Sequence, residues 1–129
     1  MRAAIDTNRL TDLFRGDKHL GDWLGECDQI YVPLPVLAEI KAGFAGGARR
    51  PENEAVLREF LLKPTVSVLL PGRETAEHYA RLFVQLRIAG TPIPINDLWI
   101  AALVVEHDLV LVTRDAHFRR IPQIIATQP

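Results

Sequence analysis

Four carboxylates stand where short apolar runs begin, end or are interrupted, and together they could bind a cation. They are Asp6, Glu39, Asp97 and Asp115. Like charges that are brought together raise each other's pKa unless a cation neutralises them. Because the sequence offers these acids no obvious lysine partners, the pattern indicates a site for a hard divalent cation.

These acids describe an all-oxygen site, because no His or Cys directly adjoins any of them. Such ligands suit Mg²⁺ or Mn²⁺ better than zinc. A cation held in this way can orient a water molecule, lower its pKa and stabilise the charge that develops on a phosphodiester during in-line attack. Thr7, Asn8 and Thr113 flank the acids, and they could hold the carboxylates in position or contact a phosphate.

Each acid taken alone has a simpler explanation. A single Asp after a strand caps a turn or helix more often than it binds a metal, and Asp97 alone would be read as a helix-start residue. The combination favours a site, because the run 98–105 after Asp97 is apolar nearly all round and a buried, unpartnered carboxylate is costly. His117 lies close to Asp115, and it is interpreted as a surface or packing residue rather than as a general acid.

Hydrophobic periodicity and turn residues predict the elements that position these acids. Strands are predicted at residues 2–5, 29–33, 65–70, 109–113 and 123–126. A first helix is predicted to start at Thr7 or Asn8 as its cap and to end at Gly16, and further helices at residues 19–26, 34–45, 52–63, 72–89 and 97–106, the last capped by Asn96. In the helix over residues 72–89, the side chains expected to face the core are Ala76, Tyr79, Ala80, Phe83 and Leu86.

The alternation of strands and helices predicts an α/β fold with a mostly parallel sheet covered on both faces. Ligands of such sheets bind at the carboxyl ends of the strands, near a topological switch. Asp6 and Asp115 are expected just past two strand ends, Asp97 in the first turn of a helix and Glu39 one turn into another. One pocket could therefore hold all four acids.

Length and composition fit one domain over residues 1–129, with 48% hydrophobic residues and a net charge of −1. Cys27 is the only cysteine, which excludes an intrachain disulfide. The N-terminus has no apolar stretch for a signal peptide, and the longest apolar run, 98–105, is far too short to span a membrane. A cytoplasmic protein without membrane contact is expected.

The basic residues are mostly arginine, with 12 Arg against 3 Lys, and arginine suits bidentate phosphate contacts. Small clusters lie at 49–50 and around Arg114, Arg119 and Arg120. Either cluster taken alone is more simply a solvated face or a set of ion pairs. The bulk charge therefore does not indicate a nucleic-acid binder, although the arginines could serve one.

Four segments resemble the blocks of the PIN-domain family, in particular the VapC-type toxins of bacterial and archaeal toxin–antitoxin pairs. The segments are Ile5-Asp6-Thr7-Asn8, Leu37-Ala38-Glu39-Ile40, Asn96 to Ala102 (NDLWIAA) and Leu111 to Phe118 (LVTRDAHF). The blocks occur in the family's order and span nearly the whole chain. The resemblance implies a PIN-like three-layer α/β/α sandwich with a central, mostly parallel sheet.

The resemblance also implies an activity. Such proteins are Mg²⁺- or Mn²⁺-dependent endoribonucleases whose acids, matched here by Asp6, Glu39, Asp97 and Asp115, bind the metal and activate a water that attacks RNA. Thr7, Asn8 and Thr113 would support these acids, and Arg9, Arg114 and Arg119 are candidates for RNA contacts. The products in the family carry a 5′-phosphate and a 3′-hydroxyl.

The resemblance implies partners as well. Family members are commonly homodimers and are neutralised by a VapB-type antitoxin whose C-terminal segment covers the active-site groove. The apolar surface of the helices at 52–62 and 72–89 is consistent with a dimer.

Two positions depart from the family pattern. Arg9 stands where an apolar residue is common, and the last acid, often Asn in relatives, is Asp115, which could ligate the metal directly or act from the outer shell.

Other functions fit the sequence less well. A phosphoacceptor receiver domain needs a second acid beside Asp6 and a lysine after the last strand, but no Lys follows Lys63. A haloacid-dehalogenase-like phosphatase needs Asp-x-Asp, whereas residues 6–8 read Asp-Thr-Asn. A non-catalytic PIN-like module that binds RNA or protein, and a housekeeping RNA-processing nuclease, remain as alternatives to a toxin.

Overall fold

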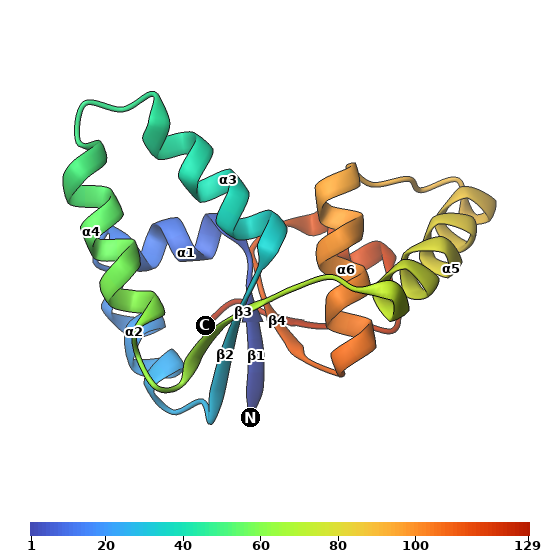
Figure 1. Cartoon of the computed structure of the whole chain (residues 1–129). Helices are drawn as coiled ribbons and strands as arrows, with labels where there is room; N and C mark the ends of the chain where they lie inside the picture. Colours follow the sequence, from blue (N-terminus) through green and yellow to red (C-terminus); the bar gives the residue numbers. More distant parts are fainter.

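A five-stranded parallel sheet forms the centre of the molecule (Figure 1). The computed structural model describes residues 1–129. The strands are β1 (Arg2–Ile5), β2 (Gln29–Pro33), β3 (Val66–Leu69), β4 (Val110–Val112) and β5 (Ile125–Thr127). Their order across the sheet is β3-β2-β1-β4-β5, and every neighbouring pair is parallel.

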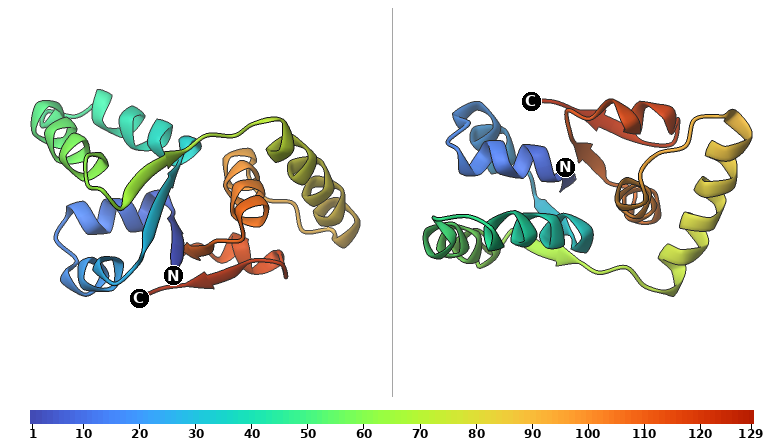
Figure 2. Two further views of the ribbon diagram at one scale, coloured as in Figure 1. Left: turned by 60° about the horizontal axis from the view of Figure 1, so that its bottom comes forward. Right: turned by 90° about the horizontal axis from the view of Figure 1, so that it is seen from above.

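Helices cover both faces of this sheet. They are α1 (Thr7–Phe14), α2 (Lys18–Gly25), α3 (Leu34–Ala45), α4 (Arg50–Leu61), α5 (Arg73–Ala89) and α6 (Ile95–His107), followed by a 3₁₀ turn at Ala116–Arg120. Figures 1 and 2 show α1 to α4 on one side of the sheet and α5 and α6 on the other. The predicted α/β class and three-layer α/β/α arrangement are confirmed.

The core is built around central strands that are apolar on both faces, as a doubly covered parallel sheet requires, whereas the edge strand β5 is largely exposed. Ala3, Ala4 and Ile5 of β1 have no exposed surface. The central helix α6 is buried over most of its circumference, as its sequence predicts, at Leu98, Ile100, Ala101, Ala102, Leu103 and Val104. No helix of the structure is long and apolar enough to cross a membrane.

Three local predictions are wrong. Asp6, not Thr7 or Asn8, caps α1, because its carboxylate accepts a hydrogen bond from the Thr7 N–H. The helix α6 begins at Ile95 with no side-chain cap, so Asn96 lies inside its first turn. These errors share a cause, since a cap depends on the backbone angles just before the helix, which several neighbouring polar residues could supply.

The third error concerns the face that α5 buries. The prediction is confirmed for Leu86, which is buried, and for Tyr79, which packs against the core. It is wrong for Ala76, Ala80 and Phe83, which are exposed, and it missed the buried Thr75 and Leu82. Because α5 carries apolar side chains on two faces, its periodicity could not identify the face that packs on α6. The second face stays in solvent at Phe83, Val84 and Ile88.

The strand order places a topological switch between β1 and β4. From β1 the chain moves outward to β2 and β3, and it then returns past β1 to form β4 and β5. The connections that leave β1 and β4 therefore diverge at the carboxyl edge of the sheet, which is where ligands of such sheets bind. Asp6 follows β1 there, and Thr113 follows β4.

Candidate metal centre

Asp6 is held rigidly at this switch point. Its side chain is buried, with the residue 4% exposed. One carboxylate oxygen, Oδ1, accepts a hydrogen bond from the Thr7 N–H at 2.7 Å, and the other, Oδ2, accepts one from the Thr113 hydroxyl at 2.8 Å. The main-chain N–H of Asp6 donates to the carbonyl of Val112 at 3.0 Å. The pairing of β1 with β4 therefore fixes the main chain on both sides of the Asp6–Thr113 hydrogen bond.

Thr113 joins Asp6 to Asp115. Its hydroxyl donates to Asp6 and accepts a hydrogen bond from the Asp115 N–H at 3.0 Å. Asp115 in turn caps the 3₁₀ turn that follows, because its Oδ1 accepts from the His117 N–H at 2.9 Å. One Thr113 hydroxyl thus orients the Asp6 carboxylate and ties down the main chain of Asp115, which is consistent with the supporting role predicted for it.

Asp97 projects from the first turn of α6 toward the same turn. Its Oδ2 lies 2.9 Å from Nδ1 of His117, and this nitrogen also lies 3.1 Å from Oδ1 of Asp115. The ligand atoms of Asp97, Asp115 and His117 all lie within 4.8 Å of one another, the spacing of groups that can share one metal ion. Asp6 and Glu39 are not within that set.

Glu39 approaches from the opposite side of the sheet, on α3. Its Oε1 accepts a hydrogen bond from the Asn96 side chain at 3.4 Å, so Asn96 contacts a predicted ligand instead of capping α6. The contact joins α3 to α6, two helices that also pack against each other. Glu39 is half-buried, and this long hydrogen bond restrains it less than Thr7 and Thr113 restrain Asp6.

The acids act on each other electrostatically. Burial, together with the charges of Asp97 and Asp115, raises the pKa of Asp6. Burial and the charges of Asp6 and Asp97 raise the pKa of Glu39. Burial and the charge of Asp115 raise the pKa of Asp97, against the opposing effect of the His117 contact. The four side chains therefore form one coupled cluster that favours an added positive charge.

The donor set fits a divalent cation. None of the four carboxylates forms an ion pair with Lys or Arg, and His117 is the one basic side chain that contacts them. The hydroxyl of Thr7 is buried beside Asp6, and it also lies near the Glu39 carboxylate, whose pKa it acts to lower. Carboxylate and hydroxyl oxygens are the ligands that Mg²⁺ and Mn²⁺ prefer.

The three arginines predicted to contact RNA lie in different environments. Arg9 is buried, with 6% of its side chain exposed, and it pairs with Asp12 at 3.0 Å and Asp17 at 3.5 Å. Its guanidinium also donates to the main-chain oxygen of Pro129. The structure therefore corrects the expectation for Arg9, because its guanidinium is buried and its two terminal nitrogens are hydrogen-bonded inside the protein.

Arg114 and Arg119 remain at the surface. Arg114 is 44% exposed, and two of its nitrogens donate to the two oxygens of Asp12 at 3.0 and 3.4 Å. Arg119 is exposed on the 3₁₀ turn. Asn8 is also exposed, in the first turn of α1 and next to Thr7. These three side chains can meet a ligand that approaches the acids from solvent.

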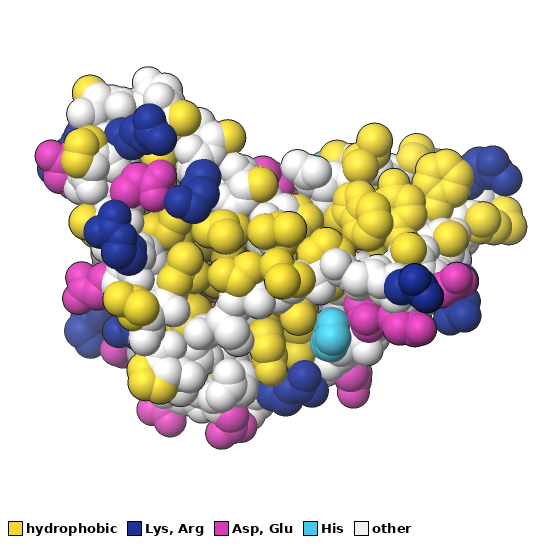
Figure 3. Space-filling model, in the orientation of Figure 1, with side chains coloured by type: hydrophobic (Ala, Val, Ile, Leu, Met, Phe, Trp, Pro, Cys, Tyr) yellow, Lys and Arg dark blue, Asp and Glu magenta, His cyan; other side chains and the backbone are white.

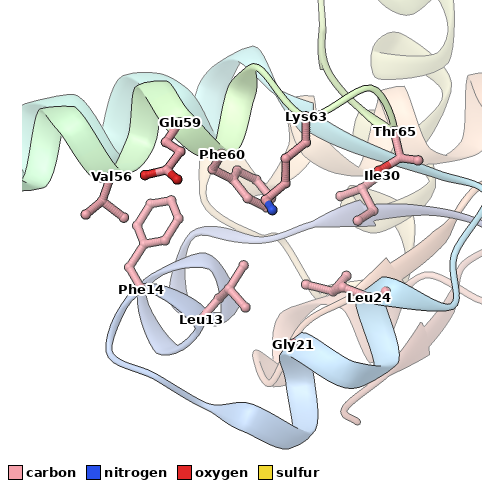
Figure 4. Close-up of a pocket in the computed structure, with 11 residues that line it drawn as sticks. Leu13, Phe14, Gly21, Leu24, Ile30, Val56, Glu59, Phe60, Lys63 and Thr65 are labelled. Carbon is pink, nitrogen blue, oxygen red and sulfur yellow. The ribbon is translucent and has the colours of Figure 1, made fainter.

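A groove leads away from the acids between α1, α2, α3 and α4. A cavity of about 420 Å³ begins at Thr7 and Glu39 and continues along α1, α3 and α4. A second cavity of about 390 Å³ lies between α1, α2 and α4, and Phe14 and Val56 line both. Figure 4 shows the second cavity with apolar side chains from three helices and β2 and with Glu59 and Lys63 on α4 and just after it.

Sequence reasoning missed the contacts of two residues in the cluster. The sequence predicts Asn96 to be a helix cap and His117 to be a surface or packing residue, but both side chains contact the acids. The one sequence signal for His117 was its position two residues after an Asp at the start of a tight turn, where the Asp carboxylate commonly binds the N–H two residues on. That turn brings the imidazole back to Asp115, and only the tertiary structure adds Asp97.

Known proteins resemble this chain over most of its length. Residues 3–124 match the PIN domain family. A stretch of 93 residues is 39% identical to Ribonuclease VapC4 of Mycobacterium tuberculosis and covers 72% of each protein. A stretch of 98 residues is 30% identical to Ribonuclease VapC1 of Haemophilus influenzae and covers 75% of this chain and 72% of that relative.

Solved structures share the fold. The structure of VapBC-1 from nontypeable Haemophilus influenzae matches with a TM-score of 0.87 and 25% identity over 99% of this chain and 98% of that one. DNA-bound VapBC from Salmonella typhimurium matches with a TM-score of 0.89 and 24% identity over 98% of this chain and 97% of that one.

Proposed function

This chain belongs to the PIN-domain family, and from that premise we propose that it is a metal-dependent endoribonuclease and the toxin of a toxin–antitoxin pair. The observation that carries the proposal is the cluster of carboxylates at the switch point of the sheet, in which the pKa values of Asp6, Glu39 and Asp97 are raised and no acid has a Lys or Arg partner. The names of the relatives, ribonucleases of the VapC type, support the same activity.

In the proposed mechanism, Mg²⁺ or Mn²⁺ is held by Asp6, Glu39, Asp97 and Asp115. When bound, the cation supplies Lewis acidity toward the attacking water and the phosphodiester. Thr113 and the Thr7 N–H keep the Asp6 carboxylate in one orientation, and Asn96 orients Glu39. Arg119, exposed near Asp115 in the chain, is proposed to contact the RNA backbone, and Arg114 could do so with the part of its guanidinium that Asp12 does not engage.

We propose the groove between α1, α2 and α4 as the docking site for the antitoxin. The relatives of known structure are toxin–antitoxin complexes by name. This groove is largely apolar, and through Phe14 and Val56 it joins the more polar cavity that Thr7 and Glu39 line, so an apolar segment bound in the groove could continue to the acids. Because Val56 is 44% exposed, Val56→Glu should leave the fold intact and weaken antitoxin binding, whereas Leu70→Glu, outside the groove and also exposed, should not.

We also propose a homodimer that uses the exposed face of α5 and the start of α6. Phe83, Val84, Ile88 and Ile95 are between 43% and 81% exposed there, and Figure 3 shows hydrophobic side chains gathered over this part of the molecule. An apolar patch of this kind on a small domain indicates a protein interface. In analytical ultracentrifugation we expect the wild-type protein to sediment as a dimer and Ile88→Asp to sediment as a monomer.

RNA cleavage tests the activity. Purified protein without antitoxin should cut RNA in Mg²⁺ or Mn²⁺ and not in EDTA, and Asp97→Asn should remove the activity. The matched control is Asp108→Asn, the same change at an exposed left-handed residue between α6 and β4, a conformation that Asn tolerates. Metal binding without cleavage of a broad RNA pool would indicate a narrow substrate. Absence of both would support the non-catalytic binding module.

A further inference from the structure

We propose that His117 is a nitrogen ligand of the metal ion in the acidic cluster and that it shifts the preference of the centre from Mg²⁺ toward Mn²⁺. This inference rests on the proposed function, because it requires the cluster to bind a divalent cation. It adds one ligand to the four carboxylates and predicts a property, metal preference, that carboxylates alone would not give.

The positions of the ligand atoms support this role. Nδ1 of His117 lies 2.9 Å from Oδ2 of Asp97 and 3.1 Å from Oδ1 of Asp115. In an octahedral shell with bonds of about 2.1 Å, neighbouring ligand atoms are about 3 Å apart. Here Nδ1 hydrogen-bonds to Asp97. A metal ion that displaced a proton from Nδ1 would find this nitrogen and the two carboxylates at the spacing of ligands that share one coordination shell.

The imidazole is held in this position by the fold rather than by a flexible surface loop. The 3₁₀ turn Ala116–Arg120 carries His117, and the next residue, Phe118, is 1% exposed and belongs to the core. The turn packs on α6, the helix that carries Asp97. The His117 N–H is bonded to Asp115, so main chain and side chain are both tied to the cluster. The side chain remains 37% exposed, which leaves the ring accessible to an incoming ion.

The chemistry of the donor atoms sets the expected preference. Mg²⁺ is a hard ion that strongly prefers oxygen ligands and keeps several of its waters. First-row transition metals accept imidazole more readily, and their affinity for a given nitrogen–oxygen site rises from Mn²⁺ onward. Adding the Nδ1 of His117 to the carboxylate ligands therefore favours Mn²⁺ relative to Mg²⁺.

Pulsed EPR of bound Mn²⁺ tests the proposal directly. Wild-type protein loaded with Mn²⁺ should show the ¹⁴N modulation of a coordinated imidazole, and His117→Gln should lose it. In competition titrations His117→Gln should also lose about tenfold of the preference for Mn²⁺ over Mg²⁺. The matched control is His107→Gln, because His107 contacts Glu106 at the far end of α6 and should leave both readouts unchanged.

The wild-type spectrum separates the possible results without relying on a variant. Bound Mn²⁺ with a ¹⁴N signal that His117→Gln removes would confirm His117 as a ligand. Bound Mn²⁺ with no ¹⁴N signal would overturn this inference and leave the proposed carboxylate centre intact. No bound Mn²⁺ at all would overturn both, because the cluster would then hold no metal.

Discussion

Asp6 caps α1 and Asp12 lies within it, but only Asp12 is paired with basic side chains of the protein. The acids of the proposed metal centre thus form the unneutralised group, and Asp12 with Arg9 and Arg114 forms the neutralised group. Asp12 accepts hydrogen bonds from Arg114 and Arg9, and these bonds hold its pKa below the usual value despite partial burial. Asp6, at the start of the same helix, has no arginine or lysine partner, and burial raises its pKa. Asp6 is also the more deeply buried of the two acids, so deeper burial and the lack of a protein cation together distinguish the proposed metal ligand from the structural acid.

The two groups are also physically connected. Arg114, which pairs with Asp12, lies between Thr113 and Asp115 in the chain. The ion pair therefore anchors the segment that orients Asp6 and carries Asp115 against α1. In this arrangement the neutralised group stabilises the structure that holds the unneutralised group together.

The largest expected effect is on RNA cleavage, which should depend on Asp6 and the other acids of the unneutralised group. Asp6→Asn keeps the size of the side chain and removes its charge, so we expect RNA cleavage to fall by more than about 100-fold, beyond the loss typical of an outer-shell partner. Initial rates in saturating Mn²⁺ measure this, with circular dichroism to confirm folding and Asp108→Asn as the control. Full activity in Asp6→Asn would remove Asp6 from the metal centre.

Metal binding should stabilise the protein through the unneutralised group, which contains Asp6, and not through Asp12. At a free Mg²⁺ or Mn²⁺ concentration of 100 times its Kd, the free energy of unfolding should rise by about 2.7 kcal/mol. Urea denaturation with metal and with EDTA measures the gain. We expect a clear gain in wild type and in Asp12→Asn, and almost none in Asp6→Asn. An equal gain in Asp6→Asn would place the cation elsewhere.

The neutralised group should instead matter for stability without metal. Asp12→Asn weakens charged hydrogen bonds to Arg9 and Arg114, and we expect it to lower the free energy of unfolding by about 2 kcal/mol in EDTA at pH 7. A carboxyl group whose pKa is lowered on folding stabilises the protein above its unfolded value of 3.8 and loses this effect as the pH falls through the folded value.

Denaturation of wild type and Asp12→Asn across this pH range checks the prediction. The difference between the two proteins should be largest near neutral pH and shrink in acid. A difference that stays constant with pH would show that packing of the Asp12 side chain, rather than its charge, carries the effect.

The smallest expected effect is a gain in stability without metal when the Glu39 charge is removed, opposite in sign to the loss expected for Asp12→Asn. Glu39 has a raised pKa, so its ionised form is disfavoured in the folded protein, and this cost appears as the pH rises above the ordinary value of 4.5 and is complete above the folded value. Because Glu39 is only half-buried, we expect Glu39→Gln to stabilise the metal-free protein by about 0.5 kcal/mol at pH 7 and by nothing below pH 4.5.

Thermal or urea denaturation in EDTA at the two pH values measures this difference. Glu39→Gln retains an oxygen that can accept from Asn96, so the contact between α3 and α6 should survive in the variant. Destabilisation at pH 7 would mean that the Glu39 charge is favourable without metal, contrary to the comparison between the two groups.

The sequence by itself determined the fold class, the buried central helix and the edge of the sheet toward which the acids are directed; that all four bind one ion stays a prediction. These follow from short-range patterns, because a parallel sheet gathers its strand ends at one edge and an apolar helix such as α6 has to be covered. It did not reveal the state of Arg9, the contacts of Asn96 and His117 or the buried face of α5. Each of these depends on residues distant in sequence, such as Pro129 for Arg9, Glu39 for Asn96 and Asp97 for His117. Only the packing of the sheet and its two helical layers brings those groups together.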